Sequence, residues 1–187
     1  MLDTLSYIGE KFNDAGVLWA TGASMVLNHY GLVDKPNDID ILVDINDIKR
    51  ADEILKELGS KKPLEKGESA LYSTKYFYEY IVNGIDVDIM AGFAINFDEG
   101  TYEYSFDKEA VTNAKKTNGV EIPLTSLEDW YVLYQLMPNR EKKVSIIEEY
   151  LLVNGIKEPH LINRALSKEL PNNIRERIEL LISSQKM

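Results

Sequence analysis

The sequence carries two pairs of aspartates whose spacing could place carboxylates side by side. Asp38 and Asp40 belong to the stretch Asp-Ile-Asp-Ile-Leu-Val-Asp, and Asp86 and Asp88 to Ile-Asp-Val-Asp-Ile-Met. This alternation of acidic and aliphatic residues predicts two β-strands, in which residues i and i+2 share a face. We therefore expect each pair on one face of its strand, with the aliphatic residues facing a core. Neighbouring carboxylates repel each other, and a divalent cation such as Mg²⁺, which prefers oxygen ligands, would offset that repulsion.

A glycine turn ahead of the first pair could bind phosphate. Val17–Ala20 predicts a short buried strand that ends near Gly22, and Ser24–Tyr30 predicts a short helix that stops at Gly31. A glycine lets the backbone approach a ligand closely, and the free N–H groups at a helix N-terminus favour an anion. In an inert protein the same residues would form an ordinary turn beside a surface strand with solvated aspartates. The case for chemistry therefore depends on the rest of the chain.

The remaining first half of the chain predicts further α/β elements around these strands. They are an amphipathic helix over residues 3–15, a second helix from Asn46 to Gly59, a loop over residues 60–72 with at most one short strand, and a strand over Ser73–Val82. Asn83-Gly84 is a strong signal for a two-residue hairpin turn, so that strand should pair with the one that begins at Ile85.

The second half changes from strands to helices. Residues 91–107 are expected to be irregular, with room for a short strand at Tyr102–Phe106, and Asn118-Gly119 predicts a second hairpin, between Val111–Lys116 and Val120–Leu124. Thr125-Ser-Leu-Glu has the pattern of a capping box, and apolar stripes at helical spacing follow it to the end. We therefore expect an α/β core over residues 1–124 and a helical region over residues 125–187.

Composition restricts the class of protein. The 187 residues suit one domain, or one domain with a helical appendage, and 44% hydrophobic and 28% charged residues are typical of a soluble globular protein. A net charge of −10 argues against nucleic acid as the main partner, because phosphate neutralisation needs a basic face. No cysteine is present for a disulfide or a thiolate metal site, and two histidines cannot build a His-rich zinc site. We find no signal-peptide pattern and no membrane-spanning run, so the expected location is the cytoplasm.

Taken in order, these pieces resemble the nucleotidyltransferase superfamily that includes DNA polymerase β. Thr21-Gly-Ala-Ser ends a strand at a helix start, Asp38-Ile-Asp follows, and Val87-Asp-Ile carries a third carboxylate on a later strand. The family pattern is a glycine and a small residue, then Asp-x-Asp, then an aspartate on a neighbouring strand. The motifs cover residues 15–92, and Ile122–Trp130 looks like the segment that enters the C-terminal helices of such proteins. In size and layout the chain looks most similar to the small nucleotidyltransferases that act on lincosamides or aminoglycosides.

The resemblance implies an α+β fold, a mixed sheet flanked by helices with a C-terminal helical part. It also implies transfer of a nucleoside monophosphate from a nucleoside triphosphate to a hydroxyl of a small molecule or protein. Asp38, Asp40 and Asp88 would hold two Mg²⁺ ions, and Asp88, with Asp86 as second candidate, would take the hydroxyl proton. The backbone around Gly22, Ala23 and Ser24 would orient the triphosphate.

Two departures from the family pattern leave the activity open. Ala23 stands where the family usually has Gly or Ser, so a hydroxyl contact would have to come from Ser24. Related proteins often carry Arg-x-Lys-Asp with another aspartate in the helical part, whereas Arg140-Glu-Lys-Lys lacks both acids. Lys142, or its neighbour Lys143, could still reach the triphosphate.

Two other classes of protein therefore stay open. One is a catalytically inactive nucleotidyltransferase-like module that binds nucleotide or protein, for example as an antitoxin. The other is a plain α/β interaction domain whose aspartates only solvate a sheet. The sequence names neither the acceptor nor the base, although an acidic surface is compatible with a cationic small molecule. A homodimer through the aromatic-rich strand is also open.

Overall fold

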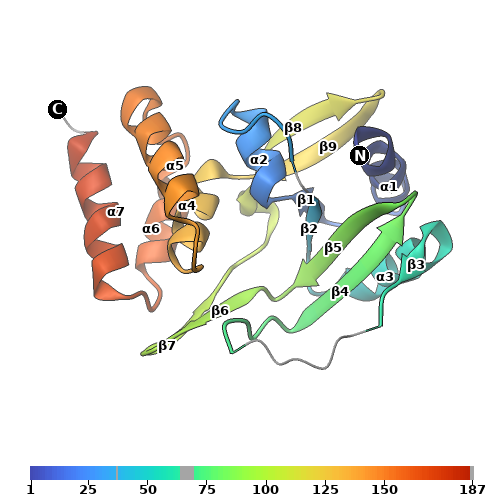
Figure 1. The fold of residues 1–187 in the computed structure, drawn as a ribbon, viewed down its shortest axis with the longest axis horizontal. Helices are drawn as coiled ribbons and strands as arrows, with labels where there is room; N and C mark the ends of the chain where they lie inside the picture. The colour runs from blue at the N-terminus through green and yellow to red at the C-terminus, as the bar shows by residue number, and fades with distance from the viewer. Residues whose placement is uncertain (37, 64–69, 186–187) are drawn as a thin grey trace.

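The computed structural model describes residues 1–36, 38–63 and 70–185, and a seven-stranded mixed sheet forms their centre (Figure 1). Its strands are β1 Trp19–Thr21, β2 Ile39–Val43, β3 Ser60–Lys61, β4 Tyr76–Val82, β5 Ile85–Ala91, β8 Val111–Thr117 and β9 Val120–Thr125. They lie in the order β3-β4-β5-β2-β1-β9-β8. β2 pairs with β5 and β1 with β9 in parallel, and the other neighbours are antiparallel. The predicted α+β class with a mixed sheet is confirmed.

Helices cover the sheet in two groups. The elements outside the large sheet are α1 Leu2–Asp14, α2 Ala23–His29, α3 Ile48–Leu58, the strand pair β6 Ala94–Phe97 and β7 Gly100–Glu103, the 3-10 helix η1 Lys108–Ala110, α4 Leu127–Gln135, α5 Glu141–Asn154, α6 Pro159–Leu166 and α7 Asn172–Ser184. Figure 1 shows α4–α7 gathered on one side and α1 and α3 on the other, with α2 between them. No helix within the described residues is both long enough and apolar enough to cross a membrane.

The alternation in β2 and β5 sorts their side chains between two hydrophobic clusters. Ile39, Ile41, Val87 and Ile89 are fully buried in the cluster that α1 and α3 cover. Leu42 and Met90, which follow the aspartates on the opposite face, belong to the cluster that contains α2 and the C-terminal helices. The aspartates therefore lie on the face of the sheet that the helical region borders, as side chains that alternate across a strand must.

Both predicted hairpins are confirmed. Asn83 and Gly84 have φ angles of 51° and 75°, and Asn118 and Gly119 have 50° and 84°. Two successive left-handed residues make the type I′ turn that Asn-Gly favours, because its twist matches that of the strands. The first turn pairs Val82 with Ile85 and thereby fixes the register of the whole β4–β5 hairpin.

The stretch that was expected to be irregular contains a third hairpin, so that prediction was wrong. β6 and β7 pair from Phe97 with Gly100 to Ala94 with Glu103, around a turn at Asp98-Glu99. The expected strand at Tyr102–Phe106 instead begins at Gly100 and ends at Glu103. Asp-Glu is not a hairpin signal, and strands of four residues have too little periodicity to be recognised. Of the loop expected over residues 60–72, residues 64–69 lie outside the described part.

The cap of α4 falls one residue later than predicted, at Ser126 in place of Thr125. Ser126 Oγ accepts a hydrogen bond from Asp129 N at 2.9 Å. Thr125 still belongs to β9, and its hydroxyl donates to Thr21 O at 3.2 Å and accepts from Trp130 Nε1 at 2.8 Å. Because these bonds already occupy Thr125, the helix can begin only after it.

The core is continuous across the end of β9. Trp130 and other residues of α4 share one hydrophobic cluster with Val26 and Leu27 of α2 and with Leu42 of β2. The contact is closest at Gly22, where a Cβ would lie 2.3 Å from Trp130 Cζ2 and 2.9 Å from Leu42 Cδ1. A glycine is therefore needed at this turn for steric reasons, whatever it binds.

We predict that Gly22→Ala lowers the free energy of unfolding by about 3 kcal/mol, because the added methyl overlaps a buried indole that cannot move away. Gly100→Ala is the matched control. Its Cβ would meet Glu169 Oε2 at 2.8 Å and Phe97 Cζ at 3.2 Å. Because the first side chain is flexible and the second is only half-buried, both can shift, and we expect a change of less than about 1 kcal/mol. Urea unfolding of both variants measures the difference. Equal losses would contradict the steric argument.

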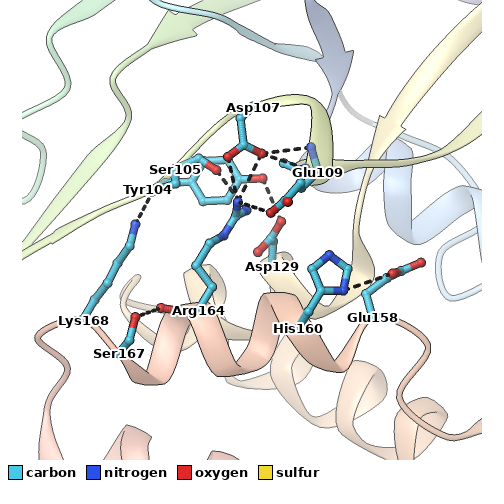
Figure 2. A network of polar contacts seen from close by, with 11 residues as sticks. Tyr104, Ser105, Asp107, Glu109, Asp129, Glu158, His160, Arg164, Ser167 and Lys168 are labelled. Carbon is cyan, nitrogen blue, oxygen red and sulfur yellow. Dashed lines mark hydrogen bonds and ion pairs between the residues drawn. The ribbon is translucent and has the colours of Figure 1, made fainter.

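A polar network also joins the helical region to the loop after β7 (Figure 2). Tyr104 donates to Asp129 Oδ2 at 2.9 Å, and Figure 2 shows this bond together with the ion pair of Arg164 and Asp107. Arg164 Nη1 lies 2.9 Å from Asp107 Oδ2, and Arg164 Nη2 donates to Ser105 O at 3.1 Å. Asp129 is buried, and loss of solvation raises the pKa of its carboxyl to about 6, although Tyr104 and Ser126 stabilise the charge.

Asp129 should therefore make stability depend on pH. Its pKa is about 6 in the folded chain against an ordinary 3.8, so the stability that it contributes below pH 4 is lost as the pH rises through 6. We expect Asp129→Asn to gain about 3 kcal/mol relative to the unaltered chain between pH 4 and 7. Asp52→Asn should show a constant difference over this interval, because the pKa of Asp52 is lowered to about 2. Unfolding curves at several pH values measure both, and parallel behaviour of the two variants would contradict the assignment.

Candidate active site

The parallel pairing of β2 with β5 brings the two aspartate motifs together. Asp40 and Asp88 are direct partners across these strands, and both side chains are half-buried. Asp38, also half-buried, lies just before β2 and acts on both through its charge. The three carboxylates that were predicted as ligands from positions far apart in sequence thus lie in one acidic cluster.

The pKa values of Asp40 and Asp88 show that the cluster is electrostatically unfavourable when both are charged. Loss of solvation, and then the charges of Asp38 and Asp88, raise the pKa of Asp40 to about 7, while Lys143 opposes the shift. Loss of solvation, followed by the charges of Glu79 and Asp38, raises the pKa of Asp88 to about 6. Near neutral pH the cluster therefore holds its negative charge at a cost, and a bound cation would reduce that cost.

The donor set suits Mg²⁺ that is held jointly with phosphate. Among the described residues, no group of three or more Asp, Glu, His or Cys side chains is placed so that it could hold a metal ion. Mg²⁺ rarely needs such a group, because it keeps several waters and binds through one or two carboxylates plus substrate phosphates. Asp38, Asp40 and Asp88 supply carboxylate oxygens, the ligand type that Mg²⁺ prefers, and the charges of Lys143 and Lys62 offset the raised pKa values of Asp40 and Asp88 only in part.

Asp86 has a different environment from Asp88. Its side chain is exposed, and Lys62 Nζ lies 2.6 Å from Asp86 Oδ1 and 3.9 Å from Glu79 Oε1. The ion pair with Lys62 engages Asp86 at the outer side of the cluster, whereas Asp88 lies directly opposite Asp40. Of the two aspartates considered from the sequence, Asp88 is the direct partner of Asp40.

Glu79 is a member of the cluster that sequence reasoning missed. It is the direct partner of Asp88 across β4 and β5, and its charge is the largest electrostatic influence on Asp88 after burial. The signal was present in the sequence. Once Asn83-Gly84 is taken as a two-residue turn, counting outward from Val82 and Ile85 places Glu79 opposite Asp88.

The glycine turn lies beside the cluster, but only some of its hydrogen-bonding groups are free to contact a ligand. Gly22 N donates to Asp40 O at 3.0 Å, so this amide is already occupied, and the bond holds the turn against β2. Ala23 has a φ angle of 47°, a left-handed conformation that glycine adopts more readily. Ala23 and Ser24 begin α2, where N–H groups have no partner within the helix. Ser24 Oγ is buried and makes no hydrogen bond within the described part of the chain.

The helical region contributes positive charge through Lys143. This half-buried residue of α5 donates from Nζ to Tyr134 Oη at 3.2 Å. Loss of solvation and the charge of Arg140 lower the pKa of Lys143, while the charges of Asp40 and Asp38 raise it. Lys142, the residue first considered from the sequence, directly precedes Lys143 in the helix and is exposed. The lysine that the structure places within the field of the aspartates is therefore Lys143.

This site lies in a fold shared with solved structures. No protein-family model and no curated protein sequence matches the chain. A presumed nucleotidyltransferase from Thermotoga maritima is 26% identical, with a TM-score of 0.61 over 80% of this chain and 91% of its own. ANT(2″)-Ia in complex with adenylyl-2″-tobramycin is 14% identical, with a TM-score of 0.56 over 89% of this chain and 97% of its own. The lincomycin-bound lincosamide antibiotic adenylyltransferase LnuA is 18% identical, with a TM-score of 0.52 over 78% of this chain and 95% of its own. The chain has the layout of a nucleotidyltransferase, as its motifs predict.

Without metal, the aspartate cluster should destabilise the protein. We expect Asp40→Asn to raise the midpoint of thermal unfolding by about 5 °C at pH 8 in EDTA, since it removes a carboxylate whose pKa is raised to about 7. The gain should shrink at pH 5, where Asp40 in the folded chain binds a proton.

Asp86→Asn is the matched control for this prediction, because it removes an exposed carboxylate of the same strand pair. Loss of its ion pair with Lys62 should change stability by at most about 1 kcal/mol, and in the destabilising direction. Differential scanning fluorimetry can compare the variants. A gain with Asp86→Asn as large as that with Asp40→Asn would contradict the assignment of the strain to Asp40.

Proposed function

We propose that this protein is a Mg²⁺-dependent nucleotidyltransferase, which transfers a nucleoside monophosphate from a nucleoside triphosphate to a hydroxyl of a small molecule or protein. The observation that carries the proposal is the pairing of Asp40 with Asp88, with Asp38 beside them, on the face of a nucleotidyltransferase-like sheet that the helical region borders. Half-burying three carboxylates together costs free energy, and aspartates that served only solubility would remain exposed.

In this proposal Asp38, Asp40 and Asp88 hold the metal. Bound Mg²⁺ would neutralise charge on the phosphates that enter the cluster. The chain itself provides rigid positions for these ligands, because β2 and β5 fix Asp40 and Asp88 through their backbone pairing. Ile39 and Val87, buried on the reverse face, prevent either strand from rotating its aspartate away.

The transfer requires a base for the acceptor hydroxyl. The hydroxyl oxygen would form a bond to the α-phosphorus, the bond from that phosphorus to the β-phosphate oxygen would break, and pyrophosphate would leave with the electron pair. Asp88 is the preferred group to take the proton, because it lies directly opposite Asp40 in the paired strands. Asp86 remains the second candidate, but its carboxylate is engaged by Lys62.

The outer phosphates need positive charge and hydrogen-bond donors. Lys143 faces the aspartates from α5 and can contribute a charge, and Arg140 at the start of the same helix can add a second. The N–H groups of Ala23 and Ser24, with the unpartnered hydroxyl of Ser24, could contact a phosphate from the other side. These groups replace the arrangement expected around Lys142 and Gly22.

Activity assays would test the proposal directly. We expect one or more of the four nucleoside triphosphates to stabilise the protein against heat only when Mg²⁺ is present, and to release pyrophosphate in the presence of a hydroxyl acceptor. Aminoglycosides, a lincosamide and a tyrosine- or serine-containing protein form a suitable first panel of acceptors. Asp40→Asn and Asp88→Asn should lower turnover at least about 100-fold, because each removes a proposed metal ligand.

Asp86→Asn decides between the two candidate bases. Turnover within about threefold favours Asp88, because Lys62 engages the carboxylate of Asp86, and a loss as large as that of Asp88→Asn would assign the base to Asp86. Unchanged turnover in Asp40→Asn would sink the mechanism. Binding of Mg²⁺ and nucleotide with no turnover on any acceptor would instead favour the alternative, a catalytically inactive binding module, for which the missing acids near Lys142 are the motivating feature.

A further inference from the structure

Tyr134 is a buried residue that faces the aspartate cluster without belonging to any motif. It lies on α4 with 2% of its surface exposed, and the charges of Asp40 and Asp38 both act on it. Its ring packs against Trp130, with 5.2 Å between the ring centroids, and Trp130 in turn contacts the turn at Gly22. The phenol is therefore fixed in place by the same packing that joins the helical region to the sheet.

The contacts of Tyr134 converge on one lysine. Lys143 Nζ donates to Tyr134 Oη at 3.2 Å and lies 4.7 Å from the centroid of the same ring. The hydroxyl and the ring face thus hold the ammonium group by a hydrogen bond and a cation–π contact. Within the described residues, no ion pair joins Lys143 to a carboxylate.

This support matters because lysine is a flexible side chain. An ammonium on a four-carbon stem is a mobile point charge, and beside two aspartates it would be drawn into a direct ion pair. A direct ion pair with Asp40 would neutralise a carboxylate that the metal needs. Held by Tyr134, the ammonium lies near the aspartates and keeps two N–H donors available for another anion.

We infer that Tyr134 is a positioning residue, whose hydroxyl and ring hold the ammonium of Lys143 where it binds the outer phosphates of the nucleoside triphosphate. The inference rests on the proposed function and adds a residue to it. Tyr134 itself need not touch the substrate. Its removal should weaken binding of the phosphate chain only through Lys143.

Calorimetric titration with inorganic tripolyphosphate in the presence of Mg²⁺, and with the triphosphate that the protein prefers, tests this inference. We expect Lys143→Met to raise the dissociation constant about 20-fold, the loss of one charge-assisted contact. Tyr134→Phe, which keeps the ring, should raise it about fivefold. Because Tyr134 acts through Lys143, the double variant should bind no worse than Lys143→Met alone.

Two matched controls separate positioning from stability. Tyr131 is a buried tyrosine of the same helix whose hydroxyl donates to Glu148 at 2.6 Å, so Tyr131→Phe also loses a buried hydroxyl contact. Lys142→Met removes the adjacent exposed charge. Both should leave the dissociation constant within about twofold, although Tyr131→Phe should lose as much thermal stability as Tyr134→Phe.

The outcomes distinguish this inference from the proposed function. If the unaltered chain binds neither probe with Mg²⁺, both are overturned. If it binds, but Tyr134→Phe behaves like Tyr131→Phe, or the effects of Tyr134→Phe and Lys143→Met simply add, only the positioning role is overturned. A fivefold loss that disappears in the Lys143→Met background supports it.

Discussion

The parallel pairing of β2 with β5 is the constraint on which the site depends. It sets Asp40 directly against Asp88, an arrangement that their charges oppose. The opposing force comes from the reverse face, where aliphatic residues of both strands are fully buried, each worth about 1.5–3 kcal/mol. Because side chains alternate along a strand, burying those residues necessarily presents the aspartates together on the other face. The hydrophobic core thus stabilises the like-charge contact that the proposed chemistry uses.

The helical region completes the site and is more than an appendage to the sheet. Trp130 fills the space beside Gly22, and the same helix carries Tyr134, which supports Lys143 of the next helix. One run of packing contacts therefore connects the glycine turn, the aspartates and the lysine. The acids that related proteins carry near this lysine are missing, and the structure instead surrounds it with an aromatic ring, Arg140 and the aspartates themselves.

Patterns that depend on local geometry were predictable from the sequence. Alternation located both aspartate strands, and each Asn-Gly turn located a hairpin. The fixed loop length of Asn83-Gly84 also contained the register that places Glu79 beside Asp88, although Glu79 was missed. Features that depend on which of two adjacent residues takes a role could not be predicted from the sequence. Lys142 and Lys143 differ by about 100° around a helix, so choosing between them requires knowing how α5 packs. Likewise, only the hydrogen bonds of Thr125 to β1 and Trp130 explain why the cap of α4 falls on Ser126. The short β6–β7 hairpin lacked any local signal.

The ion pair of Arg164 with Asp107 restricts the ways in which a substrate of the proposed reaction could reach the aspartates. Together with the Tyr104–Asp129 bond, it joins α4 and α6 of the helical region to the loop after β7. A clamshell motion about the connection between β9 and α4 would have to break this fastening and separate a continuous core at once. In the proposed reaction, substrates would then reach the carboxylates from the β4 side of the sheet, where Phe77 and Ile81 are exposed, without a hinge between the two parts. In the proposed reaction, such a layout would keep the two parts at a nearly constant separation while loops admit the acceptor.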